Sequence, residues 1–210
     1  MTVDLRQRIA DLGASLFARR LTFGRTGNIS VRTGDHVLLT PTGASLGALD
    51  PAELSVLDLE GTHLDGRKPS KEAFLHLAMY RARPAETAVV HLHSTYSVAV
   101  SCLAGLDESN ALPPLTAYYA MRVGALPLLP YHAPGDARLG PLAEKVAGEH
   151  HALLLANHGP IVAGRDLAVA TDAVEELEET ARIFLLVRDL PTRPLGQDQV
   201  AELHAKGLTS

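Results

Sequence analysis

The stretch AVVHLHST, residues 88–95, predicts a buried β-strand that carries two histidines one residue apart. Because side chains alternate between the two faces of a strand, we expect His91 and His93 to point the same way. Such a pair offers two nitrogen ligands to a metal ion, but a tetrahedral catalytic site needs a third protein ligand and one open position. The pair alone also fits a simpler interpretation, in which one histidine makes a hydrogen bond in the core and the other lines a turn.

A third ligand would come from the other histidines of the chain. His158 is the leading candidate, because LLLANHGP places it where an apolar strand ends in Gly-Pro and a side chain can emerge at a sheet edge. A histidine that merely occupies the turn is the alternative. His76 and His132 are further candidates, for which core hydrogen bonding is the expected role. The others lie in polar surroundings and are expected to be solvated: His36, His63, His150, His151 and His204.

The composition is that of a folded protein with one core. A chain of 210 residues with 46% hydrophobic and 20% charged residues favours a single domain. The net charge of −5, with scattered Lys and Arg, argues against a nucleic-acid partner. No apolar run approaches the roughly 20 residues of a membrane span, and the amphipathic N-terminus is unlike a signal peptide. The single cysteine, Cys102, cannot form an intramolecular disulfide, so we expect a cytoplasmic protein without a membrane partner.

Predicted helices and strands alternate along the chain. Apolar periodicity and capping signals predict helices over residues 4–20, 70–83, 95–106, 139–150 and 166–188. Short apolar runs predict strands within residues 36–49, 55–61, 88–94, 125–131, 152–159 and 161–164. Residues 23–35 read as a Gly-rich segment, and residues 191–210 as a weakly patterned tail, disordered in part. This alternation predicts an α/β fold with helices on both sides of a sheet, but it leaves the strand order open.

Three loops contain the residue types that bind anions. In PSKE, Ser70 is the expected N-cap and Glu72 lies in the first helical turn, where a carboxylate is favoured and free backbone N–H groups can also bind a phosphate. The loops GRTGNIS and TPTGAS, residues 24–30 and 40–45, are candidates for the same task. Neither matches a phosphate-binding P-loop or a dinucleotide-binding fingerprint.

Two other features have ordinary explanations. The run EELEETAR, residues 175–182, is acidic, but Glu178 and Glu179 lie four and three residues before Arg182, as in surface ion pairs. We therefore interpret this run as a solvated helix face. The aromatic pair Tyr118 and Tyr119 fits either packing or a proton-donating phenol.

Taken in order, the motifs GNIS, TPTG, PSKE, HLHST and NHG resemble the class II aldolase/adducin family, which contains fuculose-phosphate aldolase and ribulose-phosphate 4-epimerase. The resemblance extends over roughly residues 5 to 188. It implies a single three-layer α/β/α catalytic domain, residues 1–190, followed by the tail of residues 191–210.

The resemblance also implies a divalent metal, usually zinc, with manganese and cobalt as alternatives, held by His91, His93 and His158. Glu72 falls at the family's catalytic acid/base, which can also ligate the metal before substrate arrives. Tyr118 matches a tyrosine that reaches the site of a neighbouring subunit in a homotetramer, and it competes with Glu72 for the role of proton donor.

The family's phosphate-binding loops match a further set of residues: Asn28, Thr42, Gly43, Ser70 and Lys71. The aldolases have a serine where this chain has Lys71. We expect Lys71 to contact a substrate anion, and phosphate is the better candidate because tight binding of a reacting carboxylate would stabilise the ground state.

Within the family, four stretches are most similar to the bacterial 3-oxo-tetronate 4-phosphate decarboxylases: PSKEAFLHLAMY, ALPPLTAYYAMRVG, LPLLPYHAPGD and EELEETAR. This resemblance implies a small phosphorylated sugar-acid substrate, which loses CO2 through a metal-stabilised enediolate to give dihydroxyacetone phosphate. A sugar-phosphate aldolase or 4-epimerase is the alternative. A non-enzymatic interaction module of the adducin kind is more remote, because the three histidines and Glu72 are all present.

Overall fold

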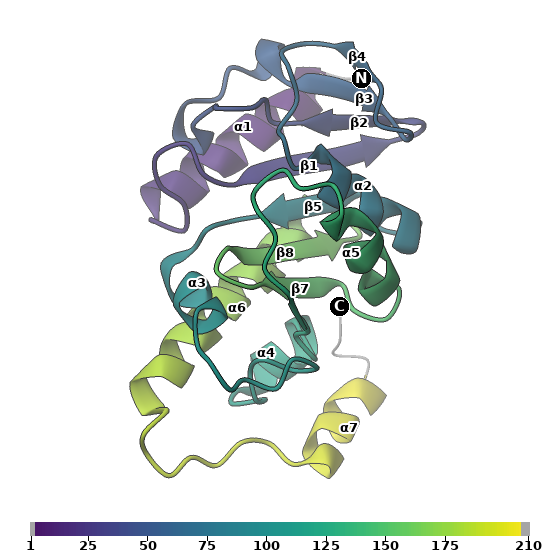
Figure 1. Cartoon of the computed structure of the whole chain (residues 1–210). Coiled ribbons are helices and arrows are strands. Elements are labelled where there is room, and N and C mark those ends of the chain that lie inside the picture. Colours follow the sequence, from purple (N-terminus) through teal and green to yellow (C-terminus); the bar gives the residue numbers. More distant parts are fainter. Residues whose placement is uncertain (1–2, 207–210) are drawn as a thin grey trace.

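The computed structural model describes residues 3–206 and has the expected alternation of helices and strands (Figure 1). The helices are α1 (Val3–Ala18), α2 (Ala73–Ala82), α3 (Thr95–Ser101), α4 (Ala117–Arg122), α5 (Leu139–Ala147), α6 (Leu167–Val187) and α7 (Gln197–Ala205), with short 3-10 turns at Leu46–Ala48 and Pro51–Glu53. The strands are β1 (Asn28–Thr33), β2 (His36–Leu39), β3 (Ser55–Asp58), β4 (His63–Asp65), β5 (Ala88–His91), β6 (Leu128–Leu129), β7 (Ala152–Leu155) and β8 (Gly159–Gly164).

All eight strands form one mixed sheet in the order β4-β3-β2-β1-β5-β8-β7-β6. Neighbouring strands are antiparallel except β6 and β7, which run parallel. Strand β5 lies between β1 and β8, so His91 pairs with Asn28 on one side and with Ile161 on the other. Segments that are far apart in the sequence therefore meet at the end of β5.

Helices cover both faces of the sheet, so the predicted three-layer arrangement is confirmed. The alternation along β5 illustrates how the strands supply two cores: Val90 belongs to the core under α1, α3, α4 and α6, and Val89 to the core under α2 and α5. Figure 1 shows α2 and α5 together on one side of the central strands. His91 has the same parity as Val89 and therefore faces α2.

The Gly-rich segment contains a strand that its sequence does not predict. Its residues Asn28–Thr33 form β1, an interior strand between β2 and β5. Ile29 and Val31 alternate into the core, and this short period-2 pattern was hidden between glycines that we interpreted as loop signals.

The predicted tail is also more regular than expected, because residues Gln197–Ala205 form α7, which contacts α4. The expectation of partial disorder in residues 191–210 stays a prediction, and residues 207–210 lie outside the described part of the chain. Among the helices of residues 3–206, none combines the length and apolar character needed to cross a bilayer.

Candidate metal centre and active site

The two histidines of HLHST converge as the sequence predicts, although β5 ends sooner than expected. The strand stops at His91, and His93 lies two residues beyond it, just before α3. The two rings are nevertheless adjacent, with their centroids 5.0 Å apart and the Nε2 atoms 3.2 Å apart. His91 Nδ1 lies 2.8 Å from the carbonyl of Pro160, so this ring donates through Nδ1 and turns Nε2 toward the cluster, where it can ligate a metal once it has lost its proton.

His158 reaches the same point from the turn between β7 and β8. Asn157 adopts a positive φ of 56°, and Gly159 follows with a φ of 143°. A Cβ at Gly159 would lie only 2.4 Å from the carbonyl oxygen of Leu92, so glycine allows this turn to pack against the chain beside His93. The turn aims His158 at the pair, with its Nε2 atom 3.1 Å from His93 Nε2.

The three Nε2 atoms have the spacing of metal ligands. Two nitrogens bound to one tetrahedral zinc lie about 3.3 Å apart, given a Zn–N distance of about 2.05 Å. The separations of 3.1 and 3.2 Å in the structure are close to this value. Together with a carboxylate oxygen of Glu72, the ligand atoms of His91, His93 and His158 all lie within 4.8 Å of one another. The donor set of three imidazoles and one carboxylate fits a divalent ion of the zinc type.

Glu72 lies at the start of α2 but not where we expected it. The helix begins at Ala73, so Glu72 is the residue before it and Ser70 precedes the helix by three residues. The chain makes a turn first, in which Ser70 accepts hydrogen bonds from the backbone N–H groups of Glu72 and Ala73. The Glu72 carboxylate consequently faces the histidines rather than the first helical turn.

The electrostatic surroundings keep Glu72 charged. Its two carboxylate oxygens lie 3.0 Å from His158 Nε2 and 3.4 Å from His91 Nε2. Burial alone would raise the pKa of Glu72, but the charge of His91 and the hydrogen bonds from His158 and His91 lower this pKa below its usual range. Burial, reinforced by the neighbouring charges of His91 and His158, lowers the pKa of His93 to about 3. A neutral His93 has the protonation state that a metal ligand needs.

The predicted anion-binding residues surround one cavity beside this cluster. A volume of about 290 Å³ is lined by all five of them, from the three loops that the sequence identified: Asn28, Thr42, Gly43, Ser70 and Lys71. Glu72 and His93 also line the cavity, so it opens directly onto the cluster. Arg25 adds a second cation that the sequence analysis missed, although it lies inside the GRTGNIS loop.

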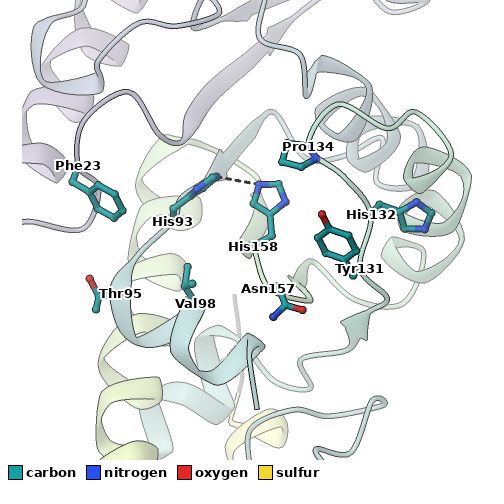
Figure 2. Close-up of a pocket in the computed structure, with 9 residues that line it drawn as sticks. All are labelled: Phe23, His93, Thr95, Val98, Tyr131, His132, Pro134, Asn157 and His158. Atoms are coloured by element: carbon teal, nitrogen blue, oxygen red, sulfur yellow. Dashed lines mark hydrogen bonds between the residues drawn. The ribbon is translucent and has the colours of Figure 1, made fainter. Parts of the chain in front are cut away.

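A second, more apolar cavity of about 420 Å³ is lined by His93 and His158. Figure 2 shows Phe23 to the left of His93, Val98 below it and Tyr131 beside His158. Tyr131 is 61% exposed. The sequence signal for this cavity is weak, because its walls come from α3 and from several loops that are far apart in the sequence.

The expectation for Glu178 differs from the structure, whereas the role of Tyr118 at the site of a neighbouring subunit stays a prediction. Tyr118 lies on the surface of α4, where Arg122 stacks over its ring at 5.4 Å, and it lines neither cavity within this chain.

Glu178 is buried and accepts hydrogen bonds from Tyr96 N, Ser97 N and Ser97 Oγ at 2.7–2.8 Å. The prediction of a solvated face is therefore wrong for Glu178, which caps the start of α3. It holds for Glu179, which pairs with Arg182 at the surface.

The other histidines behave largely as predicted. His76 is buried and hydrogen-bonded, and His132 is half-buried and lies 3.2 Å from Asp136. His36 and His63 are exposed, whereas His150 and His151 are half-buried. His151 lies 2.9 Å from the carbonyl of Ala163, so the prediction that it is solvated is wrong. The side chain of His204 lies outside the described residues.

The mixed sheet and the histidine cluster together indicate the protein family to which the chain belongs. The chain belongs to the class II aldolase and adducin family, whose N-terminal domain model matches residues 7–185. It is 50% identical, over 94% of its length and 91% of the relative, to 3-oxo-tetronate 4-phosphate decarboxylase of Pectobacterium atrosepticum. It is 35% identical to L-fuculose phosphate aldolase of Methanocaldococcus jannaschii, over 81% of this chain and 90% of the relative. The crystal structure of YgbL from Escherichia coli superimposes with a TM-score of 0.93 at 46% identity, covering 96% and 98% of the two chains.

Proposed function

We propose that this protein is a metal-dependent lyase that converts 3-oxo-tetronate 4-phosphate to dihydroxyacetone phosphate and CO2. The observation that carries the proposal is the junction of the Glu72, His91, His93 and His158 cluster with a cavity lined by anion-binding loops. Identity of 50% to a decarboxylase with that substrate, against 35% to an aldolase, favours decarboxylation over aldol cleavage.

The cavity beside the cluster is the proposed place of the substrate phosphate. Lys71 and Arg25 supply positive charge there, and the turn at Gly43 and the Ser70 loop line the same space. A dianionic phosphate forms its strongest hydrogen bonds with charged donors and backbone N–H groups, which this cavity combines. A substrate held by its C4 phosphate would extend toward His93, with C3 and C2 nearest the histidine cluster.

The reaction breaks the bond between C1 and C2 of a β-keto acid. The C1 carboxylate leaves as CO2, and the electron pair of the broken bond remains on C2, where the C3 carbonyl delocalises it. A divalent ion held by His91, His93 and His158 would supply Lewis-acid stabilisation of the charge that develops on the oxygens. Transfer of one proton to C2 completes the hydroxymethyl group of dihydroxyacetone phosphate.

Glu72 is the proposed proton carrier, because it borders both the cluster and the phosphate cavity. It would also ligate the metal before substrate binds. Tyr118 is the rival donor, and its exposed place on α4 is compatible with a role in the site of a second subunit. We propose a cytoplasmic homotetramer with zinc at each site, and manganese or cobalt as alternative ions.

The test is an assay of purified, zinc-loaded protein with 3-oxo-4-phosphotetronate, in which CO2 and dihydroxyacetone phosphate are measured together. Equal release of both products is expected, and it should be lost in Glu72→Gln, with the exposed His36→Ala as a matched control. Cleavage of fuculose 1-phosphate without release of CO2 from the tetronate would instead identify an aldolase.

A further inference from the structure

A buried chain of hydrogen bonds runs from Glu72 to the far end of α2. Asn28 Nδ2 lies 2.8 Å from Glu72 Oε2, and Asn28 Oδ1 lies 2.5 Å from His76 Nε2. His76 Nδ1 lies 2.7 Å from Ser30 Oγ, which in turn lies 2.7 Å from the hydroxyl of Tyr80. Asn28, His76, Ser30 and Tyr80 are all at least 96% buried. The four side chains come from β1 and from α2, which packs over it.

Chemistry fixes the direction of this chain, whatever orientation is assigned to the amide and the ring. A carboxylate can only accept, so Asn28 must present its NH2 group to Glu72 and its carbonyl to His76. The ring must therefore carry its proton on Nε2, which leaves Nδ1 as an acceptor for the Ser30 hydroxyl. Ser30 then accepts from the Tyr80 hydroxyl. Each member donates once toward Glu72.

The arrangement requires a neutral imidazole at His76, and the surroundings supply one. The ring is fully buried, and burial, with a smaller contribution from the charge of His91, lowers the pKa of His76 to about 3. A neutral ring has one donor and one acceptor, which are the two functions that the chain uses. Deep burial also keeps water from replacing any partner.

We propose that His76 is a positioning residue, which holds the Asn28 amide in the one orientation that donates to Glu72 and thereby fixes the carboxylate against His91 and His158. Without a donor at the place of His76 Nε2, the Asn28 carbonyl would be a buried acceptor without a partner, and rotation of the amide would aim that carbonyl at the carboxylate. The inference rests on the role of Glu72 in the proposed function. Asn28 then has two roles: it donates a hydrogen bond to Glu72, and it lines the phosphate cavity.

Two substitutions of similar size separate positioning from packing. A glutamine at position 76 can place an amide N–H near the site of Nε2, whereas an asparagine reaches only the site of Nδ1. In His76→Asn, kcat is expected to fall by about 10- to 100-fold with KM within threefold, and the dissociation constant for Co2+ added to the apoprotein to rise at least tenfold. His76→Gln should stay within about threefold of wild type in all three quantities.

Equal losses in the two variants would overturn the proposal, since a structural role predicts similar effects for both. Co2+ affinity is read from the visible absorption of the bound ion and needs no substrate, so it tests His76 even if the wild-type protein fails to release CO2. If His76→Asn does not fold by circular dichroism, Ser30→Ala decides: it removes the hydroxyl that selects the tautomer, and unchanged kcat and Co2+ affinity would refute the chain.

Discussion

His93 and His158 are separated by 65 residues in the sequence, yet their Nε2 atoms lie 3.1 Å apart. The pairing of β5 with β8 makes this approach possible, because it brings the end of HLHST beside the NHG turn. Neither histidine belongs to a strand, so both side chains are presented from the ends of a rigid sheet. This placement combines a stable scaffold with access from the two cavities.

Removal of one imidazole should abolish tight metal binding. In His93→Ala, the zinc dissociation constant is expected to rise by at least about 100-fold, since loss of an outer-shell partner alone already costs 10- to 100-fold. Competition with a chelator of known zinc affinity measures this change. The exposed His63→Ala is the control and should bind zinc like wild type. Unchanged zinc binding in His93→Ala would remove this residue from the ligand set.

The carboxylate of Glu178 should contribute to stability through α3. Glu178→Gln replaces a buried charged acceptor of three hydrogen bonds at a helix start, so the free energy of unfolding should fall by about 2 kcal/mol. The neighbouring Glu179→Gln changes only a surface ion pair and should stay within about 0.5 kcal/mol of wild type. Urea denaturation of both variants makes the comparison. If the two variants lose the same free energy of unfolding, the buried cap contributes no more stability than the surface ion pair.

The sequence was sufficient for the layered fold and the histidine cluster, because periodicity and the motifs HLHST and NHG are local signals. The role of Glu178 depended on α3, whose backbone lies 81 residues earlier, and nothing in EELEETAR distinguishes the buried glutamate from the exposed one. Strand β1 was missed because its pairing partners, not its Gly-rich flanks, determine its conformation. For the same reason, the link from Asn28 through His76 could be recognised only after β1 and α2 were placed together.

The buried imidazole of His76 should make the metal-free protein sensitive to mild acid. The folded-state pKa of about 3 lies below the unfolded value of about 6.5. The unfolded chain therefore binds a proton first, and stability falls as the pH drops below about 6.5. Wild type should lose about 2 kcal/mol more than His76→Gln between pH 6.5 and pH 5. Urea denaturation with EDTA at both values tests this difference, and the exposed His36→Gln should follow wild type. Parallel losses in His76→Gln and wild type would contradict it.

Lys71 should determine the affinity for the substrate phosphate rather than the rate of bond cleavage. It lines the cavity beside the cluster, whereas Lys68 is exposed nearby and does not line that cavity. Loss of a charge-assisted hydrogen bond to phosphate should raise KM about 10-fold or more in Lys71→Ala and change kcat less than threefold. Inorganic phosphate should inhibit this variant less than wild type by a similar factor. Lys68→Ala is the matched control and should leave KM and the inhibition by phosphate unchanged.

If kcat falls in Lys71→Ala while inhibition by phosphate persists, the lysine contacts the departing carboxylate instead. Only an interaction with the reacting group acts mainly on the rate of the chemical step.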